Sequence, residues 1–367
     1  MRIGAFTRNS CRPAYIRNSV PDYNFHMLSR RSLFSFAAKG AAVITLANIP
    51  AYNTFAAESA APAPLPFGRV AVWGYALREQ PSFNATIVKW FQYDQVIPLL
   101  EQVTGDPLGT HKNAVWFRTE GGFVHSAWMQ PVDNHPNDVL SKDAATAKFW
   151  SEVSVPFTEA RYSPGSRYYS HRLYYGTVYH VIDVVQDETG ASWYRVAEGV
   201  DGGGYVKAEH LKPIKPEDMA PISPNAENKR IEVDLPTSIL TAYEGDTAVF
   251  AAPFASGTRK KGQYTPGGSH RVLYKAPTAH MSGDIGTEDG YDLPGVAFCS
   301  FFTAQGVAIH GTYWHYDWGA RRSHGCVNVS NDTARWVWRW SNPIAPYESA
   351  WYFPKVWNSG TMVNVNY

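Results

Sequence analysis

Residues 310–328 read HGTYWHYDWGARRSHGCVN and bring one cysteine together with three histidines. Cys326 follows Gly325 in a short turn, and His310 ends the apolar stretch 307–309. A cysteine attacks a carbonyl as its thiolate, so it needs a neighbouring base or a positive potential. The resulting oxyanion needs preset donors, most simply the backbone N–H groups of a tight turn. The segment therefore has the parts of a nucleophilic cysteine site, with His310 as base and the Gly325 and Cys326 N–H groups as donors.

A zinc site is the first alternative. His310, His315, His324 and Cys326 are the right ligand types, because zinc binds imidazole and thiolate in sets of four. Their spacing matches none of the usual paired-ligand patterns, and the chain contains no CxxC or HExxH. Packing in an aromatic-rich loop explains the Trp and Tyr residues but not two histidines beside a glycine-flanked cysteine. The spacing therefore favours the nucleophile.

The elements around this segment are predicted to be mostly strands. Residues 231–235 alternate apolar and polar side chains, and a turn at 244–246 leads to a second strand at 247–251. Short apolar strands are expected at 296–302 and 306–309. Only residues 332–340 have helical character, with Asn331 or Asp332 as the cap. This last domain should be β with one helix.

An internal repeat precedes it. Residues 123–132 align without gaps to 205–214, and at the same offset of 82 residues 93–103 align to 175–185. Such a repeat of short strands and Gly- and Asp-rich turns predicts two small β-barrels, at 66–135 and 155–215. Residues 136–154 are predicted as a linker with at most a short helix. Trp116 and Trp193 are expected in the barrel cores rather than on a binding face.

The N-terminus resembles an export leader. Residues 1–60 carry seven Lys and Arg against two acids, so of the net charge of +1 the rest of the chain carries −4. Arg30-Arg31 after Ser29, followed by an apolar and then alanine-rich run, resembles a twin-arginine signal, with an ordinary Sec leader as the alternative. Met27 is a second candidate start. We expect an exported protein of the cell envelope or extracellular wall, and a mildly acidic body argues against nucleic acid as a partner.

Of the three cysteines, Cys11 lies in the leader. Cys299 and Cys326 could form a disulfide, but a single disulfide in a protein of this size would not be the framework that holds its fold together. Cys299 lies in the apolar run 296–302 and is predicted to be a buried strand thiol.

Two family resemblances follow from these motifs. Ile309-His310-Gly311-Thr312 with Ser323-His324-Gly325-Cys326-Val327-Asn328 resembles the signature of L,D-transpeptidases, bacterial wall enzymes with a catalytic cysteine. The resemblance covers about 229–345 and leaves 346–367 as a C-terminal extension. Residues 265–268 resemble the family's threonine-proline turn, and the departure at 269–271 falls in a turn expected to be scaffold. The repeat resembles bacterial Src-homology-three-like (SH3-like) barrels. The expected fold is thus mainly β, a β-sandwich catalytic domain after two small barrels.

The L,D-transpeptidase resemblance implies a role for each site residue. Cys326 is the nucleophile, His310 its base, and the Gly311 carbonyl orients the imidazole. Gly325 and Cys326 form the oxyanion hole, Ser323 and His324 shape the site, and Asn328 braces the turn. His324 is equally open to a purely structural role. The substrate-binding candidates are Asn328, Arg322, Met281 and Tyr291, and His315 is placed with Arg322 within reach of a substrate carboxylate. No metal or organic cofactor is implied.

The implied reaction is acyl transfer on peptidoglycan stem peptides. Cys326 would expel the terminal D-alanine of a tetrapeptide and pass the acyl group to an amine of a neighbouring stem, and carbapenems would acylate it. The barrels would hold the enzyme on the wall polymer. Two rivals stay open, an L,D-carboxypeptidase in which water is the acceptor, and a wall-binding protein with a silent site. The oligomeric state is open as well.

Overall fold

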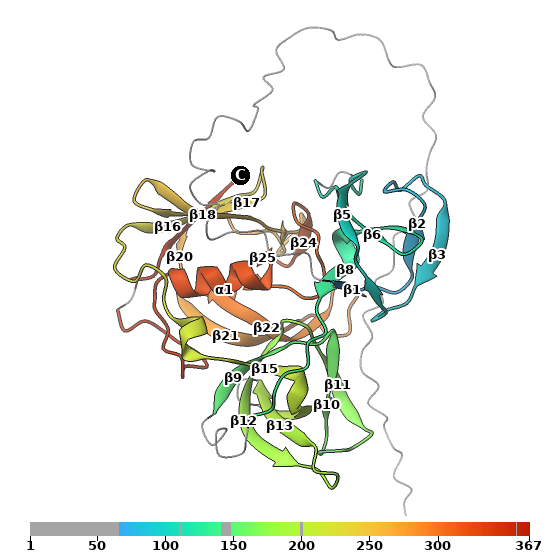
Figure 1. The fold of residues 1–367 in the computed structure, drawn as a ribbon. Helices are drawn as coiled ribbons and strands as arrows, with labels where there is room; N and C mark the ends of the chain where they lie inside the picture. The colour runs from blue at the N-terminus through green and yellow to red at the C-terminus, as the bar shows by residue number, and fades with distance from the viewer. Residues whose placement is uncertain (1–65, 110–111, 141–147, 199–200, 357) are drawn as a thin grey trace, which may run out of the picture.

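The computed structural model describes residues 66–367 except 110–111, 141–147, 199–200 and 357 (Figure 1). The predicted leader, and the linker up to residue 65, lie outside the described residues. The prediction of a mainly β fold is confirmed, since strands dominate and residues 331–340 form the α-helix α1. Among the described residues, no helix is long and apolar enough to cross a membrane.

The first unit is built from two antiparallel sheets, with strand orders β4-β1-β8 and β3-β2-β7-β6-β5. It is drawn in blue and cyan in Figure 1. Its strands are β1 (Phe67–Val70), β2 (Tyr75–Arg78), β3 (Ile87–Phe91), β4 (Val96–Pro98), β5 (Glu101–Thr104), β6 (Val115–Thr119), β7 (Gly122–His125) and β8 (Met129–Val132). The buried side chains of Val70, Leu77, Phe117 and Val124 form its core, and Trp116 is buried as predicted.

The second unit is one seven-stranded sheet in the order β11-β10-β14-β13-β12-β9-β15. Its strands are β9 (Phe149–Val153), β10 (Phe157–Arg161), β11 (Tyr169–Tyr174), β12 (Val178–Gln186), β13 (Ser192–Glu198), β14 (Asp201–Lys207) and β15 (Leu211–Ile214). Residues 149–153 were predicted as linker, but they pair with β12 and β15 inside this sheet. The unit therefore begins at residue 149 rather than 155. Trp193 is buried here, as expected.

The internal repeat corresponds to a shared succession of elements. β7, the 3-10 helix η2 (Ser126–Trp128) and β8 have their counterparts 82 residues later in β14, η3 (Ala208–His210) and β15. The other half of the repeat differs. Where the second unit has the continuous strand β12, the first has β4 and β5 in two different sheets. Pro98 ends β4, consistent with the missing N–H that confines proline to strand edges and ends.

The third unit packs two sheets around α1 (Asn331–Trp340). One sheet has the order β18-β17-β16-β26-β20 and the other β21-β22-β23-β25, with a short pair β19-β24 between them. The strands are β16 (Lys229–Asp234), β17 (Ile239–Glu244), β18 (Thr247–Pro253), β19 (Ser256–Gly257), β20 (Gly268–Arg271), β21 (Tyr274–Gly283), β22 (Tyr291–Phe301), β23 (Ala308–Gly311), β24 (Arg321–Ser323), β25 (Val327–Val329) and β26 (Met362–Asn366). The short 3-10 helix η4 (Pro216–Met219) precedes them.

The boundary predicted at residue 345 is wrong. β26 runs parallel to β16 and antiparallel to β20, so residues 362–366 complete the larger sheet of this unit. Residues beyond 345 are therefore part of the domain and not an extension. The pairing joins segments more than 100 residues apart, which short-range sequence patterns do not reveal.

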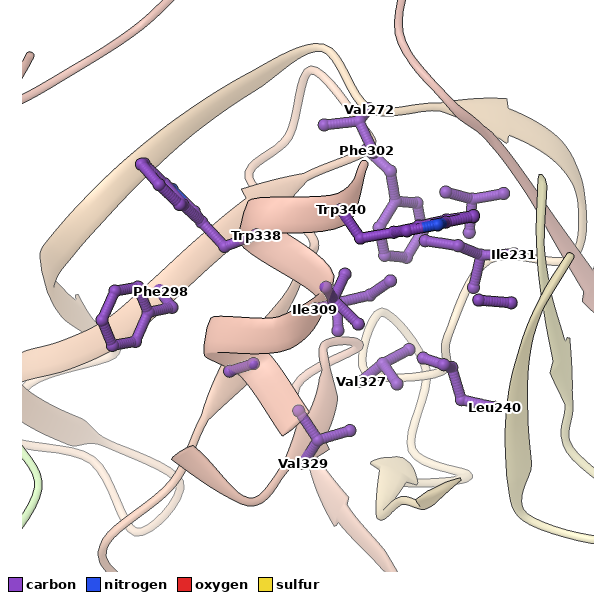
Figure 2. Packing of buried hydrophobic residues seen from close by; sticks show 14 of the residues in the cluster. Ile231, Leu240, Val272, Phe298, Phe302, Ile309, Val327, Val329, Trp338 and Trp340 are labelled. Carbon is purple, nitrogen blue, oxygen red and sulfur yellow. The ribbon is translucent and has the colours of Figure 1, made fainter. Parts of the chain in front are cut away.

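Helix α1 is fixed by its ends and by its buried face. Ser330, not the predicted Asn331 or Asp332, is the N-cap, and its side chain accepts a hydrogen bond from Thr333 N. Figure 2 shows Trp338 and Trp340 leaving the helix toward Phe298 on one side and Phe302 on the other. Burial of one such side chain stabilises the folded state by on the order of 2 kcal/mol. The tryptophan layer therefore helps to hold the two sheets together.

The units contact one another through polar groups. Asn331 Nδ2 donates to Gly176 O of the second unit at 2.8 Å, and Trp150 Nε1 donates to Tyr347 O at 2.7 Å. Trp150 also belongs to the core cluster of the third unit. The first unit lies beside β24 and β25 in Figure 1, at the side of the third unit that carries residues 310–328.

Candidate active site

Cys326 occupies the turn between β24 and β25. Gly325 has a φ of +122°, a region that side chains rarely adopt, and a Cβ there would lie 3.3 Å from Tyr264 O. The Ser323 hydroxyl donates to Cys326 O at 2.6 Å and accepts from Gly325 N at 3.1 Å. Ser323 and Gly325 therefore fix the backbone conformation of the turn that contains the half-buried Cys326.

The predicted oxyanion hole is only half available in this geometry. The N–H of Gly325 already donates to Ser323 Oγ, so the resting structure does not offer it as a free donor. The reason is local, because a serine two residues before the glycine closes a small side-chain-to-backbone turn. The role expected for Gly325 N–H requires this hydrogen bond to open.

Strand pairing brings His310 to the strand that follows Cys326. β23 runs parallel to β25, and His310 pairs with Asn328, two residues after the cysteine. His310 Nδ1 lies 2.8 Å from Gly311 O, and because a carbonyl only accepts, Nδ1 carries the hydrogen. A Cβ on Gly311 would lie 2.1 Å from Asn331 Oδ1, so glycine is required at this position. The carbonyl thus orients the imidazole and leaves Nε2 as its basic atom.

The charges of the pair follow from burial. Burial lowers the pKa of His310 to about 4, and the hydrogen bond to Gly311 opposes this only in part. Burial likewise raises the pKa of Cys326 to about 11, against a smaller lowering by a backbone hydrogen bond at Ala308. At neutral pH the resting site therefore holds a thiol and a neutral imidazole. A thiol that attacked a carbonyl from this state would pass its proton to the imidazole as the bond forms.

An open cleft of about 670 Å³ reaches the turn that holds the cysteine. His324, Tyr264 and Val307 line it, and the last two are also the neighbours of Gly325. Ser269, His270 and Arg271 form part of the opposite wall with Met362. The sequence analysis assigned 269–271 to scaffold. Their departure from the family pattern was the one signal that pointed to them.

His324 and Tyr291 lie together at the mouth of the site. Their rings are 4.7 Å apart, and burial together with the Cys326 side chain raises the pKa of Tyr291. Tyr291 thus lies against His324, two residues before Cys326, and its contact with substrate stays a prediction. Met281 pairs with Leu293 across β21 and β22 and packs, partly buried, against a small core cluster. The structure gives it a packing role.

Of the predicted substrate contacts, Asn328 and His315 are buried, and Arg322 is partly buried and ion-paired. Arg322 pairs with the fully buried carboxylate of Asp317 and lies over the ring of Trp128, 4.3 Å from its centroid. His315 is 2% exposed, and burial lowers its pKa to about 3, so it offers no charge to a substrate. Asn328 is 1% exposed and donates to His310 Nε2 at 3.1 Å. The buried side chains of Asn328 and His315 do not reach a substrate in this geometry, whereas the role of the partly exposed Arg322 stays a prediction.

Among the described residues, the two cysteines form no disulfide with each other, and the histidines and cysteines form no zinc site. Cys299 and Cys326 are both free, and Cys299 is fully buried on β22, where its thiol donates to Val296 O at 3.4 Å. Among the residues that the structure describes, no group of three or more His, Cys, Asp or Glu side chains is arranged to hold a metal ion.

Residues 228–365 match the model of the YkuD family, described as an L,D-transpeptidase catalytic domain. No curated protein matches the chain. Among solved structures, an Enterococcus faecium L,D-transpeptidase mutant is 24% identical, over 38% of this chain and 50% of that chain, with a TM-score of 0.30. The chain thus spans about half the length of that structure.

Two further structures match other lengths. An L,D-transpeptidase from Mycobacterium smegmatis is 15% identical over 73% of this chain and 98% of that one, with a TM-score of 0.31. One from Xylanimonas cellulosilytica is 23% identical over 43% and 72%, with a TM-score of 0.27.

Proposed function

Residues 228–365 form a YkuD-family L,D-transpeptidase catalytic domain, and on that premise we propose that the protein cross-links peptidoglycan stem peptides through an acyl-enzyme on Cys326. The observation that carries the proposal is the pairing of β23 with β25. In this pairing His310, whose Nδ1 lies 2.8 Å from Gly311 O, is opposite Asn328 of the strand that follows Cys326, which supports a histidine–cysteine pair. A base held by a backbone carbonyl is a triad whose third member is not a carboxylate.

The first half-reaction forms a thioester. Cys326 Sγ bonds to the carbonyl carbon of the peptide bond before the terminal D-alanine, while the thiol proton passes to His310 Nε2. The tetrahedral intermediate collapses, the C–N bond breaks, and the leaving amine takes the proton from the imidazolium. The released D-alanine carries the transferred proton on its amino group, and His310 is neutral again.

The second half-reaction repeats these steps with an amine. The side-chain amine of a diamino acid in a neighbouring stem attacks the thioester and gives its proton to His310. The C–S bond then breaks, and the thiolate recovers the proton from the imidazolium. Water in place of the amine would give a carboxypeptidase. Carbapenems should acylate Cys326 by the same first step.

The resting hydrogen bonds require two local changes during the reaction. Asn328 must release His310 Nε2, since that atom accepts from the amide at rest. Gly325 N–H must release Ser323 Oγ if it is to meet the oxyanion. Both are small movements of the kind that substrate binding drives in catalytic sites whose hydrogen bonds tighten only in the complex.

The cleft supports a peptide substrate. It is open along one side, and Arg271 and His270 on its wall offer cationic and polar donors to the carboxylates of a stem peptide. We further propose that residues 1–60 export the protein and that the two N-terminal units hold it on the wall polymer. The exposed Trp73 and Trp90 of the first unit are surfaces on which a polymer could stack.

Mass spectrometry of a tetrapeptide muropeptide incubated with the enzyme tests the proposal, with Cys326→Ala as the control. A cysteine-dependent dimer that lacks one D-alanine is the expected product. A tripeptide without dimer would replace the transpeptidase by a carboxypeptidase. If neither protein turns the muropeptide over, the acyl-transfer proposal fails, and binding to isolated sacculi becomes the property to measure.

A further inference from the structure

The loop between β23 and β24 buries groups that should not be buried alone. It carries Asp317, which is fully buried, and His315, which is 2% exposed. A carboxylate removed from water costs several kcal/mol unless charged or polar partners replace the water. The loop links the base His310 to the nucleophile Cys326, so whatever supplies those partners also fixes the catalytic geometry.

Many of the partners come from the first unit. Asn113 Nδ2 donates to Asp317 Oδ1 at 2.9 Å and lies 3.3 Å from Tyr316 O. Tyr316 N in turn donates to Ala127 O at 3.0 Å. The ion pair between Asp317 and Arg322 is covered by Trp128, whose ring centroid lies 4.3 Å from the guanidinium. Three residues of the first unit thus hold one end of the loop.

A second anchor holds the other end. Arg69, which is 1% exposed, donates to the backbone carbonyl of Tyr313 at 2.7 Å. Its charge is balanced by Asp94 at 2.7 Å, which also pairs with Arg172 of the second unit. Tyr174 stacks on Tyr313 with ring centroids 5.3 Å apart. All three units therefore meet at the start of the loop.

The anchored loop reaches the catalytic base. Asp317 N donates to His315 Nδ1 at 3.3 Å, and His315 is buried beside it. Asn328 donates to His310 Nε2 at 3.1 Å. The ring of Trp314 lies 5.9 Å from that of His310. The loop that Asn113 and Arg69 hold thus reaches His310 through the ring of Trp314.

We propose that the first unit is a working part of the active site, in which Asn113 and Arg69 are positioning residues that fix loop 312–322 and, through Trp314, the imidazole of His310. The inference rests on the proposed function only in taking His310 as the base of Cys326. It gives the N-terminal unit a second role beside the wall binding proposed above.

Asn113→Asp is the most specific test. It keeps the size of the side chain and the oxygen that accepts from Val115 N at 3.0 Å. It removes the donor to Asp317 and places a second carboxylate beside the first, which disfavours the loop position. A displacement of the base by a fraction of an ångström should slow reaction at Cys326, because catalytic geometry tolerates little error.

The readout is alkylation of Cys326 by iodoacetamide in the full chain, followed by mass spectrometry from pH 5 to 10. This reaction needs no wall substrate, so it is independent of whether the enzyme is a transpeptidase. We expect Asn113→Asp to slow alkylation at pH 7 by on the order of tenfold and to move the inflection of the pH profile. Thr119→Val is the matched control, since it removes a buried hydrogen bond to Pro98 O inside the same unit and should leave the profile unchanged.

Two further variants keep the proposal testable if the Asn113→Asp protein does not fold. Asn113→Ser shortens the side chain so that it no longer reaches Asp317, and Arg69→Gln removes the charge that holds Tyr313 O. If the folded Asn113 and Arg69 variants alkylate as the wild type does at every pH, the proposal is overturned. If Thr119→Val moves the profile as far as they do, the effect is one of stability alone and the proposal fails as well. Recovery of the rate in the double variant Asn113→Asp/Asp317→Asn, which exchanges donor and acceptor, would support it.

Discussion

The side-chain amide of Asn328 donates to Nε2 of His310 at 3.1 Å, and Nε2 is the ring atom that would accept the thiol proton in the proposed reaction. The other ring nitrogen is committed to Gly311 O. The resting enzyme thus keeps its base neutral, buried and covered by an amide. In the proposed mechanism the amide must move aside before Nε2 can take the thiol proton.

Asn328→Asp should change the pH dependence of acylation. A carboxylate beside Nε2 favours the imidazolium and raises the pKa of His310 from its depressed value, by on the order of one to two units. Because only the neutral imidazole is a base, the acid limb of kcat/KM should move to higher pH. The measurement is the rate of Cys326 acylation by a carbapenem from pH 4 to 8. An acid limb in the same place as in the wild type would contradict the contact.

Protein stability should fall in mild acid. His310 and His315 have folded pKa values of about 4 and about 3, below the ordinary 6.5, so the unfolded chain binds more protons between these limits. Stability is therefore complete above about pH 6.5 and declines as the pH falls toward 4, by several kcal/mol in total. Urea midpoints at pH 7.5 and 5.0 measure the decline. His315→Asn should lessen it, and an equal decline in that variant would show that other groups are responsible.

Arg271→Ala should weaken substrate binding more than turnover. The guanidinium lines the cleft and donates to Gly360 O at 2.9 Å, with donors left for a stem carboxylate. Loss of one charge-assisted hydrogen bond should raise KM roughly tenfold, with kcat little changed. Steady-state kinetics with a muropeptide measure this. Arg118→Ala is the control, because Arg118 lies exposed on the first unit beside Glu101. A lower kcat at unchanged KM would place Arg271 outside substrate binding.

The parts of the site that depend on neighbouring residues could be predicted from sequence. His310 at a strand end, the turn at Gly325 and the buried Cys299 are local patterns of apolar runs and glycines, and the structure contains each of them. The internal repeat likewise predicts the succession that ends in β15. Such patterns depend on periodicity and turn chemistry, which act within a few residues.

What sequence reasoning missed depends on long-range pairing. Asn328 was assigned to substrate, yet the parallel register of β23 and β25 turns it to His310. Arg322 was assigned the same role, but its partner Asp317 is buried by Asn113, about 200 residues earlier. The final strand was missed because its partner β16 lies about 130 residues earlier. Side-chain direction at such sites is decided by tertiary packing, which a local pattern does not contain.

Substitution of Lys275 tests what stabilises the C-terminal end of helix α1. Its buried ammonium donates to Trp338 O at 2.6 Å and to Ser341 O at 2.5 Å, at the end of α1 where carbonyls lack helical partners. Burial, together with the nearby Lys229, lowers its pKa well below the ordinary value, so this cation is costly to keep. Lys275→Met removes that cost but leaves the carbonyls unpaired, at about 1–3 kcal/mol for each buried group. We expect the second effect to win and the free energy of unfolding to fall by about 2 kcal/mol.

Urea unfolding at pH 7.5 measures the change, with the exposed Lys212→Met as control. The helix follows directly after β25, so its loosening should also slow acylation of Cys326 once the variant approaches its midpoint. A Lys275→Met protein as stable as the wild type would mean that desolvation of the ammonium outweighs its hydrogen bonds. The end of α1 would then be held by its tryptophans rather than by the lysine.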